Sequence, residues 1–182
     1  MPLHERAQLR AAILAQLVAA NTAAGSRVSY ARQAPLVSDL LPVISVYMRE
    51  ETTTDSSKRT APRELKRDVA IAVEAWVVTV AGGDIDAEMD AIALEIETAM
   101  DGDRYLDSCA FDSVLTATEF GRSMEGARPM GCVILQYDVA YHTNARITAP
   151  VNQFDKMGTT TDLAGAQAVA DETSTLTEDI HE

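Results

Sequence analysis

The sequence is poor in the side chains that carry most enzymatic chemistry. It has three histidines and two cysteines in 182 residues, and neither Cys109 nor Cys132 belongs to a CxxC or Cys/His cluster. His4, His142 and His181 are too widely separated for their spacing to predict a metal site or a catalytic triad. No GxGxxG, GxxxxGK(S/T), GxSxG or HExxH motif occurs. We therefore expect no enzymatic activity, metal or cofactor, and we expect both cysteines to be buried thiols.

Long hydrophobic runs and basic side chains are also scarce. The apolar runs are too short to cross a bilayer, so we expect no membrane span. Fifteen Lys and Arg against 28 Asp and Glu give a net charge of -13, which disfavours nonspecific binding to nucleic acid or to an anionic membrane. A composition that is 47% hydrophobic and 24% charged is typical of a soluble globular protein with a packed core.

The apolar periodicity predicts helices and strands in a particular order. Leu9, Ile13 and Leu17 recur every four residues, which indicates an amphipathic helix over about residues 2–20. The segment DIDAEMDAIALEIETAMDG, residues 84–102, predicts a second helix, with apolar side chains on one face and acids at its start that suit the helix dipole. Strands are expected at residues 27–32, 41–49, 68–81, 113–120 and 132–143. Short links between neighbouring strands favour an α+β fold, in which a mostly antiparallel sheet has both helices packed on one face.

The last part of the chain differs from the rest. Residues 144–182 are rich in Thr, Ala and Asp, and from Pro150 to Glu182 seven acids accompany Lys156 alone. A segment of this composition cannot bury much apolar surface by itself. We therefore predict one domain over residues 1–143 and an acidic C-terminal extension over residues 144–182. We expect the extension to lie against a neighbouring subunit or partner protein, with a short helix near residues 162–170.

The predicted sheet has an open face and a long polar connection. Two helices can cover only one face, so the other face would expose Ile44 and Val46 or their neighbours together with the region of Trp76. The strand Leu41–Met48 runs directly into a charged stretch, Arg49–Lys66, which we predict to be a long loop. A loop of that length without a pattern is usually functional or disordered. We expect another chain to cover the open face and the loop to reach that chain as an arm.

These features together resemble the tail terminator proteins of long-tailed bacteriophages. The resemblance rests on the order of elements, the strand LPVISVY before the charged stretch, the GG pair before DIDAEMDAIALEIETAM, and the final strand GCVILQYDVAYHT. It covers about Met1 to Thr143 and includes no catalytic motif. The family implies a small α/β subunit that forms a six-membered ring on the tail tube, stops tube polymerisation and presents a surface to the head-completion proteins. It also implies a virion location after assembly in the host cytoplasm, without enzymatic activity or a cofactor.

The resemblance further suggests contact residues and partners. A ring of identical chains needs two unlike contact surfaces on each subunit. The expected partners are further copies of the chain, the tail tube protein and the head-tail connector. DNA is expected to pass through the lumen without specific binding, past acidic or neutral side chains that include some of the eight acids from Asp84 to Asp103. The best candidates for subunit or tube contacts are charged residues of the predicted loop: Arg49, Glu50, Glu51, Lys58, Arg59 and Arg63.

Other interpretations stay open. The stretch from Arg49 to Lys66 is alternatively a mobile, solvated loop. A neck or tail-completion protein, or a tail-tube subunit that polymerises into stacked rings, would share the small α/β architecture. A cellular α+β module that binds a small ligand would need a pocket lined by converging polar groups. An enzyme is the remaining class, and the sequence offers no motif for it.

Overall fold

The computed structural model describes residues 4–32, 35–55, 64–80, 82–125 and 128–144. The chain divides into two units, Met1–Ala145 and Arg146–Glu182. The second unit lies outside the described residues, and the helix expected near residues 162–170 lies there too. All the elements described below belong to the first unit.

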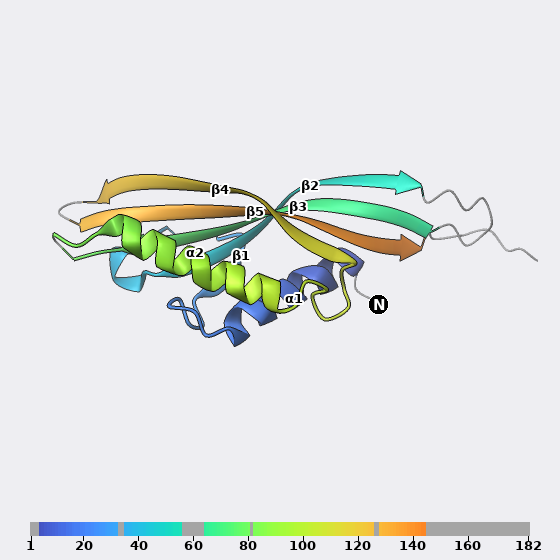
Figure 1. Ribbon diagram of the computed structural model, residues 1–182, viewed down its shortest axis with the longest axis horizontal. Coiled ribbons are helices and arrows are strands. Elements are labelled where there is room, and N and C mark those ends of the chain that lie inside the picture. The colour runs from blue at the N-terminus through green and yellow to red at the C-terminus, as the bar shows by residue number, and fades with distance from the viewer. Residues whose placement is uncertain (1–3, 33–34, 56–63, 81, 126–127, 145–182) are drawn as a thin grey trace, which may run out of the picture. The chain divides into compact units, whose positions relative to one another are not determined.

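The described residues form two α-helices, a short 3-10 helix and one five-stranded sheet (Figure 1). Along the chain the elements are α1 (Glu5–Ala19), β1 (Val28–Tyr30), η1 (Ser38–Leu40), β2 (Val43–Asp55), β3 (Glu64–Val78), α2 (Ile85–Gly102), β4 (Asp112–Glu125) and β5 (Arg128–Asn144). The strand order is β1-β2-β3-β5-β4, and every neighbouring pair is antiparallel except β1 with β2. Both α-helices pack on the same face of the sheet (Figure 1). The predicted α+β class is therefore confirmed.

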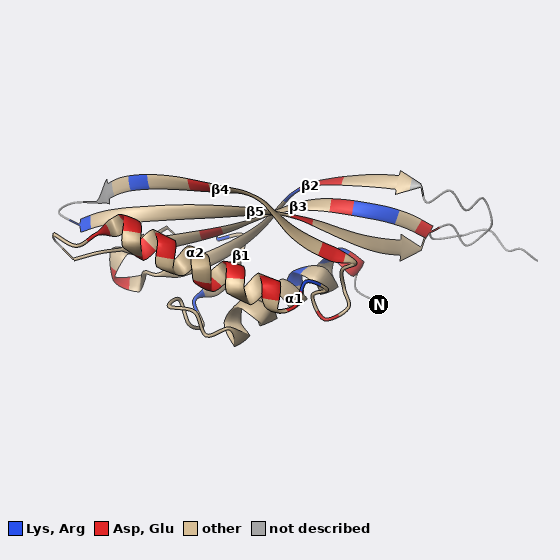
Figure 2. Cartoon of the chain, in the orientation of Figure 1, with Lys and Arg blue, Asp and Glu red and all other residues tan. Residues whose placement is uncertain are grey.

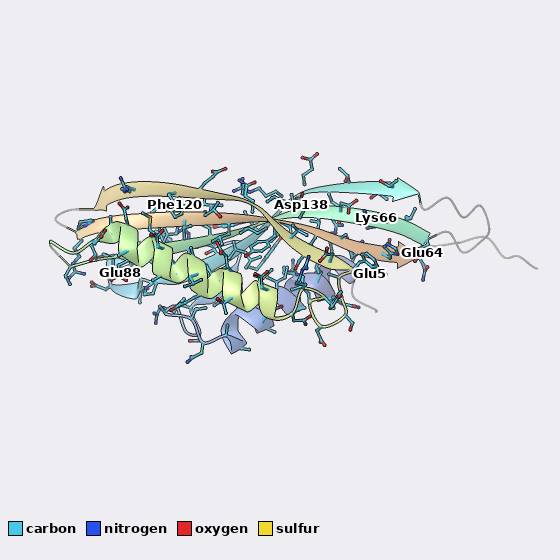
Figure 3. All side chains as sticks on the ribbon, in the orientation of Figure 1. Glu5, Glu64, Lys66, Glu88, Phe120 and Asp138 are labelled. Carbon is cyan, nitrogen blue, oxygen red and sulfur yellow. The ribbon has the colours of Figure 1, made fainter. Side chains whose placement is uncertain are left out.

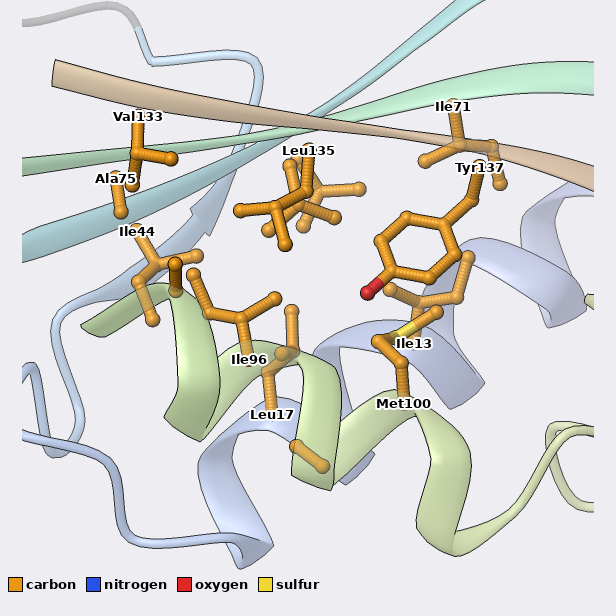
Figure 4. Close-up of a cluster of buried hydrophobic side chains, with 14 of the residues drawn as sticks. Ile13, Leu17, Ile44, Ile71, Ala75, Ile96, Met100, Val133, Leu135 and Tyr137 are labelled. Carbon is orange, nitrogen blue, oxygen red and sulfur yellow. The ribbon is translucent and has the colours of Figure 1, made fainter. Parts of the chain in front are cut away.

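The core lies between the helices and the sheet face that they cover (Figure 4). Leu9, Ile13 and Leu17 of α1 are fully buried, as their spacing predicted. Asp84 caps the start of α2 by accepting hydrogen bonds from two backbone N–H groups of its first turn. The apolar face of α2 and the inward side chains of the central strands complete the core: Met89, Ile92, Ile96, Met100, Ile44, Val46, Ile71, Val73, Ala75, Val133, Leu135, Tyr137 and Val139.

β2 and β3 are both longer than the sequence predicted. β2 continues to Asp55 and β3 begins at Glu64, so the loop predicted from Arg49 to Lys66 is wrong at both of its ends. The residues between these two strands lie outside the described part of the chain. A β-bulge after Met48 interrupts the alternation of side chains that would have indicated a continuous strand. Beyond the bulge the β-branched residues Thr52–Thr54 pair with β3, which suits their strand preference.

The outer face of the sheet carries both polar and apolar side chains. Val43, Tyr47, Trp76 and Ile134 lie on it and are half-buried, so part of the predicted apolar surface is present. Ser45, Glu74 and Gln136 occupy positions that alternate with core residues along their strands. Trp76 is half-buried there. Its indole N–H donates to Glu74 Oε1 at 2.6 Å, and the guanidinium of Arg32 lies 5.8 Å from its ring centroid. Exposed large apolar side chains lie along the edge strand β4 instead: Val114, Leu115 and Phe120.

The two cysteines differ in burial. Cys132 on β5 is buried, and burial is the main reason that its pKa rises to about 12. Cys109 is only half-buried, so the prediction of two buried thiols is correct for one of them. Both cysteines are free thiols.

Tyr137 places a polar atom in the core (Figure 4). Its side chain is 2% exposed, and its hydroxyl has no hydrogen-bond partner among the described residues. An unpaired buried hydroxyl opposes folding, whereas the ring contributes packing. We expect Tyr137→Phe to keep the fold and to raise the free energy of unfolding by about 1 kcal/mol. Urea unfolding followed by circular dichroism measures this change, and a comparable loss of stability would show that the hydroxyl is hydrogen-bonded in solution.

Candidate functional site

Three of the six predicted contact residues lie on a strand and not in a loop. Arg49, Glu50 and Glu51 belong to β2. Arg49 and Glu50 are exposed at the bulge, whereas Glu51 pairs with Val69 on the core face. The bulge therefore separates Glu51 from its two neighbours. The other three predicted residues lie outside the described part of the chain: Lys58, Arg59 and Arg63.

Glu51 is the centre of a half-buried polar network that joins α1 to the sheet. The hydroxyl of Tyr141 on β5 donates to Glu51 Oε2 at 2.6 Å, and Arg67 Nη1 on β3 donates to Oε1. Arg6 on α1 adds an ion pair, with 3.5 Å between its Nε and Oε2 of the same carboxylate. Arg67 Nε in turn donates to Thr143 Oγ1 at 2.9 Å. Three strands and the first turn of α1 therefore meet at one carboxylate.

The surroundings of Glu51 favour its charged form. Burial alone would raise its pKa, but hydrogen bonds from Tyr141 and Arg67 and the charges of Arg6 and Arg67 outweigh burial and hold the pKa below 4.5. Burial, followed by the adjacent carboxylate, raises the pKa of Tyr141. The carboxylate is therefore ionised and the phenol protonated at neutral pH. The network can hold the strands and α1 together, but neither group is poised to exchange a proton near neutrality.

A pocket of about 440 Å³ lies beside this network, between the start of α1, Tyr30 of β1 and the bulge of β2. Its charged lining consists of three arginines, Arg6, Arg10 and Arg49, and two carboxylates, Glu50 and Glu51. The guanidinium of Arg10 stands 4.3 Å from the ring centroid of Tyr30. Among the described residues Arg10 has no carboxylate partner, and Arg49 has neither an ion pair nor a hydrogen bond. We call Arg6, Arg10 and Arg49 the basic side of the domain.

Two contacts show how α2 is turned relative to its neighbours. Asp86 binds Arg122 of β4 through both carboxylate oxygens, at 2.8 and 2.6 Å. Glu95 instead accepts a hydrogen bond from the backbone N–H of Ala23, which follows α1, at 2.7 Å. Residues on the same helical stripe as Asp86 therefore lie on the β4 side of α2, away from α1.

Unpaired carboxylates continue this stripe along α2. Asp90, Glu97 and Asp101 follow Asp86 at intervals of four, eleven and fifteen residues, which places all four on one side of the helix. Asp90 and Asp101 are exposed, Glu97 is half-exposed, and none of the three has an ion-pair partner among the described residues. Acidic segments mark α2 along its length in Figure 2. We call Asp90, Glu97 and Asp101 the acidic side of the domain.

The two described histidines have structural contacts. His4 caps α1 by accepting a hydrogen bond from the backbone N–H of Arg6 at 3.1 Å. The ring of His142 stacks on Phe111, and its Nδ1 lies 2.8 Å from Oε1 of Glu64. Among the described residues, no three His, Cys, Asp or Glu side chains come close enough together to hold a metal ion. Within the same residues, no helix is both long enough and apolar enough to cross a membrane.

Comparison with known proteins assigns no family to the chain. No protein-family model and no curated protein matches it. A solved chain from the virion of a native gene transfer agent particle is 18% identical, covers 76% of this chain and 92% of its own length, and has a TM-score of 0.33. A second solved chain is 16% identical, covers 74% of this chain and 94% of its own length, and has a TM-score of 0.39. Likenesses at these TM-scores carry no argument about function.

The Glu51 network predicts a pH-dependent stability. Because folding lowers the pKa of Glu51, its contribution is complete above pH 4.5 and is lost as the pH falls through the lower folded-state pKa. At neutral pH we expect Glu51→Gln to reduce the free energy of unfolding by about 2 kcal/mol, because two charge-assisted hydrogen bonds weaken. The difference from the unsubstituted chain should shrink below pH 4.5.

Glu50→Gln is the matched control for this substitution. Glu50 is the exposed neighbour of Glu51 and takes no part in the network. Denaturant unfolding of the three proteins between neutral and acidic pH measures both effects. Equal stability of the Glu50 and Glu51 variants at neutral pH would contradict a structural role for the network.

Proposed function

We propose that this chain is a structural protein of a bacteriophage or phage-like virion and that it acts there as a tail terminator. In this role a ring of identical subunits caps the tail tube, ends its polymerisation and joins it to the head-completion proteins. Two observations support the proposal: the sequence resemblance over residues 1–143 and the unlike flanks of the described domain. The proposal includes no enzymatic activity and no cofactor.

The observation that carries the proposal is a sheet with two free and unlike edges. β4 is an edge strand of 14 residues, and no strand among the described residues pairs with its outer side. Its exposed side chains include Phe120, which Figure 3 labels on β4. At the opposite edge β1 covers β2 only from Ile44 to Val46. Long uncovered edges with apolar side chains are surfaces that another chain can cover.

Unlike edges favour a head-to-tail assembly. An isologous dimer joins each surface to a copy of itself, whereas a heterologous contact joins one surface to a different one. Heterologous contacts form a closed ring when the rotation between subunits completes a turn, and a filament otherwise. A terminator has to stop after one ring, so we propose a closed ring, with six subunits by analogy with the family that the sequence resembles.

The far ends of β2 and β3 are the proposed contact with the tail tube or a neighbouring subunit. These ends extend beyond both helices (Figure 1), and they carry Glu64 and Lys66 (Figure 3). Lys58, Arg59 and Arg63, which fall between the two strands in the sequence, keep their proposed role in this contact. The acidic extension, residues 144–182, is proposed to bind a neighbouring subunit or a partner protein.

Assembly of the purified chain tests this proposal. We expect native mass spectrometry over a wide range of concentrations to show monomers in equilibrium with one closed species of six subunits. Negative-stain images should show single rings. Stacked rings would instead favour a tail-tube subunit, and a strict dimer or monomer at every concentration would contradict a ring.

The proposed passage of DNA gives a second test. Each Lys or Arg contact with a phosphate would release counterions and hold the genome, so we propose a lumen lined by acidic or neutral side chains. We expect a gel-shift titration of the assembled ring with duplex DNA at low salt to show no binding at micromolar concentrations. Binding that weakens steeply as salt rises would show that a basic surface reaches the lumen, contrary to the proposal.

A further inference from the structure

We infer that the basic side of one subunit binds the acidic side of the next copy, so that complementary charges orient the subunits head to tail. The inference rests on the proposed ring and specifies which surfaces form its contacts. Its basis is the distribution of unpaired charges over the two flanks of the domain.

Most described bases are already engaged within the domain. Arg10 and Arg49 are exceptions, because Arg10 contacts only the ring of Tyr30 and Arg49 contacts no partner among the described residues. Both line the same pocket beside α1, where these two arginines outnumber the one exposed carboxylate, Glu50. An arginine whose guanidinium lies over an aromatic ring can still offer N–H groups to a carboxylate. Arg27 donates to the backbone carbonyls of Pro42 and Ala23. The remaining described bases form ion pairs: Arg6 and Arg67 with Glu51, Arg32 with Glu74, Lys66 with Asp68, Arg104 with Asp112, Arg122 with Asp86, and Arg128 with Asp39.

The carboxylates of the acidic side have no cationic partner among the described residues. Asp90, Glu97 and Asp101 lie on one helical stripe, where like charges four residues apart repel. Asp86, the first acid of the stripe, binds Arg122 through two parallel N–H···O bonds at 2.8 and 2.6 Å. A carboxylate on this side of α2 can therefore bind an arginine through both of its oxygens. An arginine from another copy would find unpaired carboxylates in the following turns of the same helix.

The two sides lie on opposite flanks, so they cannot satisfy one another within a single domain. The basic side belongs to α1 and to the β1 and β2 end of the sheet, and the acidic side faces the β4 end. A copy placed beside the first in the same orientation brings the basic side against the acidic side. It also brings β1 and β2 next to β4, and these strands run in opposite directions. A two-fold pair would instead place like charges together.

Each contact also combines charge with apolar surface. Tyr30 is 36% exposed beside Arg10, and Phe120 is 56% exposed on β4 beside the acidic flank. Burial of apolar side chains would supply much of the attraction, and the surrounding charges would select the partner surface. Charge complementarity therefore predicts that the basic side of one subunit contacts the acidic side of the next. Substitutions that reverse the charge of either side test this prediction.

Two charge-reversal variants test the inference. Arg10→Glu with Arg49→Glu makes both flanks acidic, and Asp90→Lys with Glu97→Lys makes both flanks basic. Each variant alone then faces like charge at every contact. We expect the concentration needed for half-assembly to rise at least about tenfold for each of them. In an equal mixture every contact between unlike variants again joins opposite charges, so we expect rings with equal numbers of the two, counted by native mass spectrometry.

A matched control separates charge complementarity from net charge. Arg128→Glu changes the net charge as much as Arg49→Glu alone does, but Arg128 starts β5 and belongs neither to the basic or acidic side nor to the far ends of β2 and β3. Its assembly should therefore stay close to that of the unsubstituted chain, whereas Arg49→Glu alone should weaken assembly. Circular dichroism of each monomer confirms folding. Charge-reversal variants that assemble normally alone, or that fail to assemble when mixed, would overturn the inference. Neither result would contradict the proposed ring. An unsubstituted chain that never forms a ring would overturn the proposed function and this inference together.

Discussion

The ladder between β3 and β5 is the constraint on which the rest of the domain depends. It pairs every residue from Glu64 to Val78 with a residue of β5. Its inward side chains form the floor on which both helices pack, and β2 and β4 attach to its two sides. The ladder therefore keeps the α1 and β1 flank apart from the β4 flank. Surfaces on these flanks can meet only between different copies of the chain.

The Glu51 network links this framework to the proposed contact surface. Its carboxylate engages Arg6 and Arg67, which leaves those two bases less available to other chains. By holding the core-facing residue that follows the bulge, it also leaves Arg49 exposed at the pocket rim. A chain with a net charge of -13 repels its own copies at long range, so any contact between copies gains from a surface where bases are unpaired. The structure places two such bases, Arg10 and Arg49, at one pocket.

The fold class and both helices could be predicted because each element has a clear apolar period. Leu9, Ile13 and Leu17 sit where a helical stripe requires them, and all three are buried. The end of β2 could not be predicted, because the bulge shifts the alternation and Glu51 is a charged residue on the core face. Prediction from sequence patterns takes charged side chains to be exposed. Glu51 is an exception, because partners on other strands pair with its carboxylate and allow it to face the core.

The candidate site could be predicted only in part. The sequence predicts Arg49 and Glu50 as contact residues in a loop; both are exposed, but on a strand, and their role in subunit contacts stays a prediction. Arg10 was missed, since only its four-residue spacing from Arg6 and its place off the apolar stripe mark it in the sequence. The acids of α2 were visible as a group. Which of them face β4 depends on how the helix is turned in the packed domain, and no local pattern encodes that.

The central claim, that unlike flanks of the same domain meet head to tail, is tested most directly by a cryo-electron microscopy reconstruction of the assembled chain. The account predicts one repeated contact in which α2 and β4 of each subunit face α1 and β1 of the next, with Arg10 and Arg49 beside Asp90, Glu97 and Asp101. A reconstruction in which two-fold pairs bring α2 against α2, or in which the acidic side faces no other subunit, would contradict it.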